Sequence, residues 1–357
     1  MSGISVYLSK ENQIFNHQWI KMAAKSGFSS IFTSLQIPEE DPKVYKELLI
    51  DLGNQAKQSS MSVFADISKK SLEHLDINID NIEKLKEFGL TGLRIDYGFS
   101  EEEVVKLSHK IKISLNASTL NEIIIKKLVE TGLNTDNVEA CHNYYPRPET
   151  GLSKDYLIKK NIMLKSFNLK ISSFIPGDGK KRQPLFKGLP TLEQHRYISP
   201  VEAYLDLIDN CYVDKVYIGD QSLEEDTLER FSLINENIVP IRYLGEKIQE
   251  FEDLYNYLDQ LLRNRPDSAR DVIRIDNSRI DLHNYYYLKQ INVIERKKGS
   301  ITIDNESYQR YAGEIHITLT DLQMDQKVNV IGHVIEQDLP LLDYIREGRP
   351  FILKKIN

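Results

Sequence analysis

The sequence has little cysteine and no long apolar stretch. Its two cysteines, Cys141 and Cys211, could form at most one disulfide, and both stand in apolar contexts. This usage is typical of reduced core thiols and excludes a secreted scaffold held by disulfides. No apolar run approaches the roughly 20 residues that cross a bilayer, and the first residues lack the basic and apolar regions of a signal peptide. We therefore expect a cytoplasmic protein with no membrane partner.

Positive charge and metal-binding motifs are also scarce. The 357 residues include 46 Lys and Arg against 53 Asp and Glu, a formal net charge of -7, so nucleic acid binding would lack its usual electrostatic driving force. The sequence contains no His-x-His, HExxH or Cys-x-x-Cys, and Gly177-x-Gly179 lacks the spacing and context of a dinucleotide fingerprint. We expect no metal and no cofactor.

What the sequence does contain, from residue 1 to about 220, is a regular alternation of short β-rich runs with longer amphipathic segments. This alternation is typical of βα units around a parallel sheet, and eight such units predict an α/β fold of the (β/α)8 TIM-barrel type. Glycines at 27, 53, 89 and 132 are predicted to cap helices. The predicted strands are 4–8, 30–34, 62–67, 92–96, 111–116, 138–144, 170–175 and 215–218, and the helices between the first six are 16–25, 42–58, 81–88, 100–110 and 120–129.

After Gly219 the pattern changes to a second, mostly β region. The sequence predicts a helix over 223–235, a strand over 239–244 and an acidic amphipathic helix over 246–263. Further strands are predicted over 272–275, 291–296, 300–303, 314–319 and 327–334, then a short helix over 339–347 and a last strand from 350. We therefore expect two domains, a catalytic barrel over 1–238 and a small β-barrel over 239–357.

Polar side chains follow each predicted barrel strand, where the active site of such a barrel lies. Asp66 ends the third predicted strand, Asp96 ends the fourth, and Glu39 follows the second. A protonated and an ionised carboxyl group facing one another are the groups that glycoside hydrolysis needs, so these three are the candidate catalytic residues. A strand-end aspartate such as Asp66 or Asp220 could instead cap the next helix.

Two long loops follow the sixth and seventh predicted strands. The first places Arg147 between two prolines, and the second is basic within an acidic protein. Arginine pairs with phosphate or carboxylate in bidentate geometry, and barrels of this type hold phosphate near strands seven and eight, so we expect a small anionic substrate. Alternatively, Lys180 and Lys181 form a solvated loop tip. The candidate substrate- and phosphate-binding residues are Asn143, Tyr145, Arg147, Glu149, Arg182, Glu193, His195 and Arg196.

Several of these strings resemble the 6-phospho-N-acetylmuramidase family. The resemblance is carried by residues 33–40, 143–152 and 188–196, with 308–317 resembling the family's second domain, and it covers the whole chain. It implies a TIM barrel followed by a cyclophilin-like β domain. It also implies hydrolysis of the disaccharide N-acetylmuramic acid 6-phosphate-β-1,4-N-acetylglucosamine in peptidoglycan recycling. That substrate carries a phosphate and a lactyl carboxylate, which Arg147, Arg182 and Arg196 could bind.

Two other classes of function remain open from the sequence. The chain could be a phosphosugar-binding or regulatory barrel without hydrolytic activity, or its β domain could be a prolyl isomerase with the barrel as a scaffold, although a fold alone does not establish a function. Retaining, inverting and substrate-assisted mechanisms all stay open, as does the formation of a homo-oligomer. A small phosphodisaccharide is the one partner that the sequence predicts.

Overall fold

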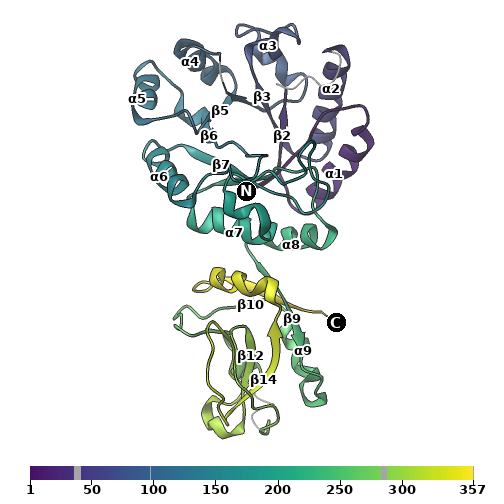
Figure 1. Ribbon diagram of the computed structural model, residues 1–357, viewed down its shortest axis with the longest axis vertical. Helices are drawn as coiled ribbons and strands as arrows, with labels where there is room; N and C mark the ends of the chain where they lie inside the picture. Colours follow the sequence, from purple (N-terminus) through teal and green to yellow (C-terminus); the bar gives the residue numbers. More distant parts are fainter. Residues whose placement is uncertain (36–41, 97, 283–287, 357) are drawn as a thin grey trace. The chain divides into compact units, whose positions relative to one another are not determined.

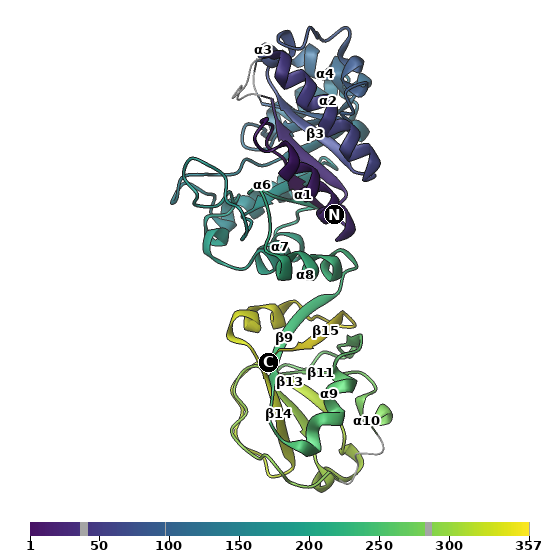
Figure 2. The same ribbon diagram turned by 90° about the vertical axis from the view of Figure 1, so that its right-hand side faces the viewer.

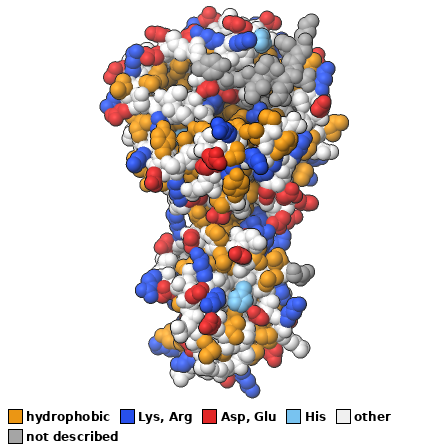
Figure 3. All heavy atoms as spheres, viewed as in Figure 1, with side chains coloured by type: hydrophobic (Ala, Val, Ile, Leu, Met, Phe, Trp, Pro, Cys, Tyr) orange, Lys and Arg blue, Asp and Glu red, His pale blue; other side chains and the backbone are white. Residues whose placement is uncertain are grey.

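The computed structural model describes residues 1–35, 42–96, 98–282 and 288–356. The chain divides into two compact units, Met1–Asn235 and Glu236–Asn357, which are described separately. Within the described residues, no helix combines the length and the apolar character that a membrane span needs. On the face drawn in Figure 3, acidic and basic side chains are interspersed over both units.

The first unit is a closed barrel of eight parallel strands in sequence order, β1 to β8, surrounded by helices (Figure 1). The predicted TIM barrel is therefore confirmed. The strands are β1 Ser2–Ser5, β2 Ser30–Ser34, β3 Ser62–Ile67, β4 Gly92–Ile95, β5 Lys112–Asn116, β6 Val138–Cys141, β7 Lys170–Ile175 and β8 Lys215–Ile218. The α-helices are α1 Gln13–Lys25, α2 Pro42–Gln58, α3 Lys69–Glu73, α4 Glu101–Lys110, α5 Glu122–Glu130, α6 Lys154–Lys165, α7 Pro200–Asn210 and α8 Glu225–Asn235, with 3-10 turns η1 Ile82–Lys86, η2 Thr135–Asn137 and η3 Glu193–Tyr197.

Local sequence signals explain most of these boundaries, and some predictions are wrong. The first strand is Ser2–Ser5 rather than 4–8, the sixth ends at Cys141 rather than 144, and the helix predicted over 81–88 is the 3-10 turn η1. The α4 helix begins with a capping box in which Ser100 and Glu103 satisfy each other's backbone amides. Gly27, Gly89 and Gly132 adopt positive φ at the ends of helices, as predicted. Gly53 does not cap a helix, because it lies inside α2. A β-carbon there would stand 2.0 Å from the carbonyl oxygen of Phe88, so the glycine permits a close approach of two backbones.

Aromatic side chains fill the interior of the barrel below its carboxyl-end mouth. Phe32, Phe174 and Tyr217 form a buried cluster with Cys141, with Phe32 edge-on to Phe174 at a centroid distance of 5.0 Å. At the opposite end of the interior, buried Glu139 lies 3.3 Å from the ammonium group of Lys215. Packed aromatic side chains therefore close the barrel interior below the mouth, and the polar side chains at the strand ends lie on the mouth side of this layer.

The second unit is a seven-stranded mixed sheet in the order β10-β15-β9-β14-β12-β13-β11, with α9 packed beside it (Figure 2). Among the described strands of this unit, β15 and β9 pair in parallel and the other pairs are antiparallel. The two edge strands meet in an antiparallel bridge between Asn264 and Ile275, so the sheet curls back on itself. The elements are β9 Val239–Gly245, η4 Gln249–Phe251, α9 Glu252–Leu258, β10 Leu262–Arg263, β11 Val272–Arg274, α10 Ser278–Asp281, β12 Ser300–Asp304, η6 Glu306–Tyr311, β13 Ile315–Thr318, β14 Val328–Val334, η7 Glu336–Tyr344 and β15 Pro350–Lys355.

Two predictions in this unit are wrong. The helix predicted over 246–263 is shorter, because buried Leu262 leaves the helical pattern to pair with Phe351 in the sheet. The strand predicted over 291–296 is irregular. The side-chain amide of Asn292 donates to the backbone oxygen of Val330, and Asn329 accepts from the amide of Ile291, so side chains replace part of a strand ladder.

Candidate active site

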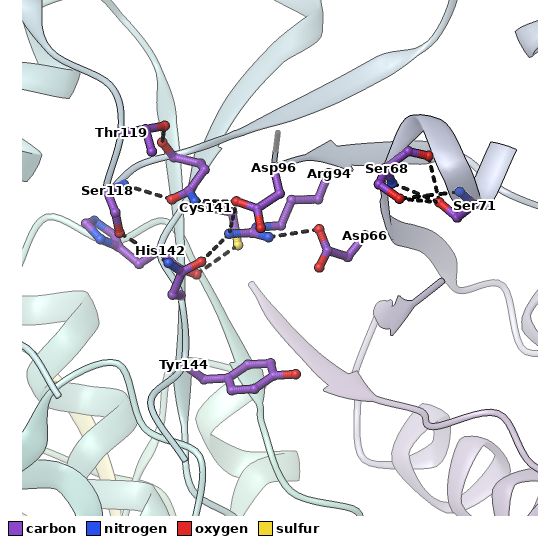
Figure 4. A network of polar contacts seen from close by, with 12 residues as sticks. Asp66, Ser68, Ser71, Arg94, Asp96, Ser118, Thr119, Cys141, His142 and Tyr144 are labelled. Carbon is purple, nitrogen blue, oxygen red and sulfur yellow. Dashed lines mark hydrogen bonds and ion pairs between the residues drawn. The ribbon is translucent and has the colours of Figure 1, made fainter. Parts of the chain in front are cut away.

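Four strand ends bring polar side chains together at the barrel mouth (Figure 4). Asp66 comes from β3, Asp96 follows β4, Asn116 ends β5 and Asn143 follows β6. Because residues two apart on a strand face the same side, Asp66 lies above Phe64 and Asp96 above Arg94. The register of β3 and β4 pairs Asp66 with Arg94, so Asp96 lies two residues further toward the mouth than Asp66.

The Arg94 side chain lies at the centre of this group and is only 5% exposed. Its Nη1 donates to Oδ1 of Asp66 over 2.8 Å, and its Nη2 donates to Oδ1 of Asn143. Oδ1 of Asp96 lies 4.0 Å from the same Nη2. Burial opposes the charge of Arg94, but Cys141, Asp66 and Asp96 outweigh it and raise the pKa of the guanidinium. The site therefore contains a permanent buried cation between two carboxyl groups.

Asp96 is oriented by an amide. Nδ2 of Asn116 donates to Oδ1 of Asp96 over 2.5 Å, and Oδ1 of Asn116 accepts from the backbone amide of Ser118. The Asp96 side chain is 29% exposed, against 14% for Asp66. Of the two carboxyl groups, Asp96 is thus the more open to a molecule entering the mouth.

Arg182 reaches the other side of the mouth from the long loop after β7. Its Nη1 donates to the hydroxyl of Tyr144 over 2.5 Å, and its guanidinium lies 4.0 Å from the centre of the Tyr7 ring. Burial raises the pKa of Tyr7 well above its usual value, and this phenol donates to the backbone oxygen of Gly219. The side chains of Tyr7 and Tyr144 therefore hold Arg182 in a fixed position.

A cavity of about 690 Å³ opens beside Arg182. Cationic side chains dominate its charge, because among the described residues Lys180, Lys181 and Arg182 line it with one acidic residue, Glu11. It is also lined by Tyr7, Ser9, Asn12, Gln183, Phe186 and Gln221. The cavity lies at the ends of β1, β7 and β8, where barrels of this type commonly hold phosphate.

Asp220, which follows β8, organises the wall of this cavity. Its buried carboxylate accepts from the backbone amides of Gly177 and Arg182, each over 3.0 Å. Burial raises the pKa of Asp220, while these amides and Lys181 act in the opposite direction. Asp220 therefore shapes the loop rather than capping a helix, and Lys180 and Lys181 belong to a cavity wall.

A second pair, Glu193 and Arg196, links the two long loops. Both Glu193 oxygens accept from Arg196, over 2.6 and 2.7 Å, and they also accept from the backbone amides of Glu149 and Gly151. Chiefly through Arg196, these bonds lower the pKa of Glu193 to about 2. Arg196 is buried and donates further to the backbone oxygens of Lys187, Gly188, Tyr145 and Arg147. The structure thus places Arg196 in the loop framework.

The other predicted binding residues lie in several settings. Asn143 belongs to the Arg94 group, and the backbone amide of Tyr145 donates to the oxygen of Pro190. Arg147 and Glu149 are exposed, while His195 is fully buried with its Nε2 3.0 Å from Asp206. Glu39 lies outside the described residues.

His142 points away from the mouth, toward α6. Its Nε2 lies 2.7 Å from Oδ1 of Asn161, and burial lowers the pKa of His142 to about 4. It is therefore a neutral structural residue.

Sequence reasoning did not select Arg94, Tyr7 or Tyr144 for the site. Arg94 had a usable signal, since it is the one charged residue in the strand Gly92-Leu93-Arg94-Ile95. A charge in a strand that is otherwise buried needs a partner, and the neighbouring strand end supplies Asp66. Tyr7 and Tyr144 carried no comparable signal, because their roles depend on the position of Arg182.

Comparisons with known proteins match both units of the chain. Residues 2–233 match a family model described as 6-phospho-N-acetylmuramidase, N-terminal, and residues 244–354 match its C-terminal counterpart. The crystal structure of a conserved protein of unknown function from Enterococcus faecalis shares 39% identity and a TM-score of 0.87, covering 99% of this chain and 96% of that one. An uncharacterized B. cereus protein shares 26% identity and a TM-score of 0.79, covering 100% and 99%. No protein with a curated function matches.

Proposed function

The chain belongs to the 6-phospho-N-acetylmuramidase family of glycosidases, and we propose that it hydrolyses N-acetylmuramic acid 6-phosphate-β-1,4-N-acetylglucosamine. The products are the 6-phosphosugar and N-acetylglucosamine. We place this reaction in the cytoplasm, in the recycling of peptidoglycan fragments. The two buried free cysteines, Cys141 and Cys211, support a reducing compartment.

One observation carries the proposal: two carboxyl groups share a barrel mouth with a cationic cavity. Asp66 and Asp96 both lie within 4.0 Å of the Arg94 guanidinium, at the carboxyl ends of neighbouring strands. Glycosidases use such a pair. One carboxylic acid protonates the leaving oxygen, and the other, as a carboxylate, acts at the anomeric carbon as nucleophile or activates water there. We therefore assign Asp66 and Asp96 to the reaction.

The cavity beside Arg182 supports the phosphorylated substrate. A phosphate on C6 carries close to two negative charges, and the cavity offers one guanidinium and two ammonium groups. Its volume of about 690 Å³ falls within the range of roughly 300 to 1,000 Å³ that is usual for small-molecule sites. We assign Lys180, Lys181 and Arg182 to the phosphate.

Product analysis tests this proposal. The purified protein is incubated in ¹⁸O-labelled water with the disaccharide in its 6-phosphorylated and unphosphorylated forms, and the products are identified by mass spectrometry. We expect cleavage of the phosphorylated form, with one ¹⁸O atom in the phosphosugar. Asp96→Asn should lower turnover by at least about 100-fold. Asn in place of exposed Asp136, in the turn before β6, is the matched control.

Two results would contradict the proposal. Binding of the phosphorylated disaccharide without cleavage would indicate a phosphosugar-binding protein. Equal cleavage of both forms would show muramidase activity but contradict the assignment of the cationic cavity to the phosphate. A proline-peptide isomerisation assay at high enzyme concentration tests the alternative function. We expect no isomerisation in this assay.

A further inference from the structure

Arg94 is unusual because it is a charged side chain buried in the barrel interior beside the reacting groups. The side chain is 5% exposed, and its Nε has no hydrogen-bond partner among the described residues. A buried cation is costly unless it is paired. A strand that carries such a residue needs a compensating partner, and here that partner is Asp66.

The two carboxyl groups meet Arg94 in different ways. Asp66 forms a direct ion pair with Nη1 at 2.8 Å, whereas Asp96 lies 4.0 Å from Nη2, beyond hydrogen-bond distance. Asp96 instead accepts a hydrogen bond from the neutral amide of Asn116 over 2.5 Å. A carboxylate that is hydrogen-bonded to a buried guanidinium stays ionised, because protonation would remove the compensating charge.

We propose that Arg94 is a positioning residue that keeps Asp66 ionised as the anionic partner of the anomeric carbon and leaves Asp96 as the proton donor. This assignment rests on the proposed hydrolysis. Asp96 gives its proton to the glycosidic oxygen, and the C1–O bond breaks with its electron pair on that oxygen. N-acetylglucosamine then leaves with a 4-hydroxyl group. Water adds its hydroxyl to C1, and its remaining proton restores the carboxyl pair.

Other titratable groups surround this arrangement and must be separated from it. Among the described residues, Asp66, Asp96, Cys141 and His142 interact electrostatically with Arg94. Glu139 on β6 acts on Cys141. Burial raises the pKa of the Cys141 thiol, so this thiol stays neutral near pH 7. Glu139 is paired with Lys112 and Lys215 at the opposite end of the barrel interior. Arg94 pairs directly with Asp66 at 2.8 Å.

The first test separates the two aspartates by the leaving group. A 4-nitrophenyl β-glycoside of N-acetylmuramic acid 6-phosphate releases its leaving group without protonation. We expect Asp96→Asn to lose at least about 100-fold in kcat on the disaccharide but less than about tenfold on the nitrophenyl substrate. Asp66→Asn should lose activity on both substrates. Rescue of Asp66→Asn by the nitrophenyl substrate, with no rescue of Asp96→Asn, would reverse the roles and overturn the proposal.

The second test addresses Arg94 through the pH profile of kcat/KM. Removing the cation in Arg94→Met should move the acidic limb upward by about 1 to 3 pH units, lowering kcat with little change in KM. Arg94→Lys keeps the charge and should move the acidic limb of the pH profile less. This variant is used instead if Arg94→Met does not fold. Lys112→Met, which removes a cation from the interior face of β5 without touching Asp66, is the control. A limb that stays in place in a folded Arg94 variant contradicts the proposal.

A third measurement does not depend on turnover. The carboxyl carbons of ¹³C-labelled aspartates are followed by NMR from pH 3 to 8, with Asp66→Asn as the assignment control. The Asp66 carboxyl group should titrate at a higher pH in Arg94→Met than in the wild type. If the wild-type protein cleaves neither substrate, the proposed function and the catalytic roles fall together. The titration then still decides whether Arg94 holds Asp66 ionised.

Discussion

The Arg182 side chain lines the cationic cavity and is held in one position by its neighbours. Its guanidinium is held between the Tyr7 ring and the Tyr144 hydroxyl, and its backbone amide is anchored by Asp220. A side chain that is already ordered loses little conformational entropy when it binds an anion. Much of the affinity for a phosphate should therefore depend on this one residue.

Arg182→Met tests this at the residue scale. Loss of a charge-assisted contact costs about 1.5 to 3 kcal/mol, so KM for the phosphorylated disaccharide should rise about 10- to 100-fold. Lys187→Met is the control, because Lys187 lies in the same loop with its side chain exposed and outside the cavity lining. Steady-state kinetics measure the effect. An unchanged KM would remove Arg182 from the phosphate site.

At the scale of elements, the two long loops of the barrel mouth are joined by Glu193 and Arg196. Arg196 spans from η3 to the backbone of the loop after β6, and Glu193 accepts from the amides of Glu149 and Gly151. Neither connection follows from local sequence, since the loops are about 40 residues apart. The pair therefore stabilises the shape of the mouth.

Glu193→Gln should weaken this connection and lower the free energy of unfolding by about 1 to 3 kcal/mol at pH 7. In the folded state the pKa of Glu193 is about 2, below its ordinary value of 4.5. The contribution is therefore fully present above about pH 4.5 and is lost as the pH falls toward 2. Urea unfolding at pH 7 and pH 3 measures the gap between wild type and variant.

The difference in free energy of unfolding between wild type and Glu193→Gln should be smaller at pH 3 than at pH 7. Glu130→Gln, at an exposed position at the end of α5, should show little difference at either pH. A gap for Glu193→Gln that is equal at both values would show that the carboxylate is not the stabilising group.

At the scale of the whole molecule, each unit has its own core and its own titrating groups. Trp19 is the single tryptophan and is buried in α1, so its fluorescence monitors the first unit. In the second unit, burial raises the pKa of Asp304 on β12 to about 7, aided by Glu314 and Asp325. The two units can therefore be perturbed and monitored separately.

Asp304→Asn should stabilise the second unit at alkaline pH. The folded-state pKa of Asp304 is about 7, above the ordinary 3.8. Between pH 3.8 and about 7, Asp304 is therefore protonated in the folded protein and ionised in the unfolded chain. The stability contribution is present below about pH 4 and is lost as the pH rises through 7. Relative to wild type, the variant should gain about 1 to 3 kcal/mol between pH 5 and pH 8.

Hydrogen exchange of the β12 amides, corrected for intrinsic rates, measures this gain, while the Trp19 transition should not change. Asp343→Asn is the control, because Asp343 is 67% exposed. A gain that does not depend on pH would contradict the titration of Asp304.

The barrel should also fold as a separate chain. A chain that ends at Asn235 keeps all eight strands, and pairing of β1 with β8 leaves no open sheet edge. We expect native circular dichroism and one cooperative Trp19 transition. A broad, non-cooperative transition would show that the first unit depends on the second.

The sequence by itself determined the barrel, since alternating strands and helices appear as local periodicity and each βα unit needs the next one to bury its apolar face. The predicted bounds of β2, β3, β7 and β8 agree with the structure. Asp66 and Asp96 could be placed at the mouth because parallel strands end at one edge of a barrel. Where pairing partners are distant, as for Leu262 with Phe351, periodicity predicted the wrong element.

Only the tertiary structure decided which charged residues are open to a ligand and which are held in the framework of the site. Arg196 and Arg182 look alike in the sequence, yet the first is saturated by loop carbonyls and Glu193 while the second lines a cavity. The same holds for Asp66 and Asp96, which differ in their contact with Arg94. Burial and the direction of long-range hydrogen bonds set the charge and accessibility of these groups, and both quantities arise only when segments distant in the chain meet.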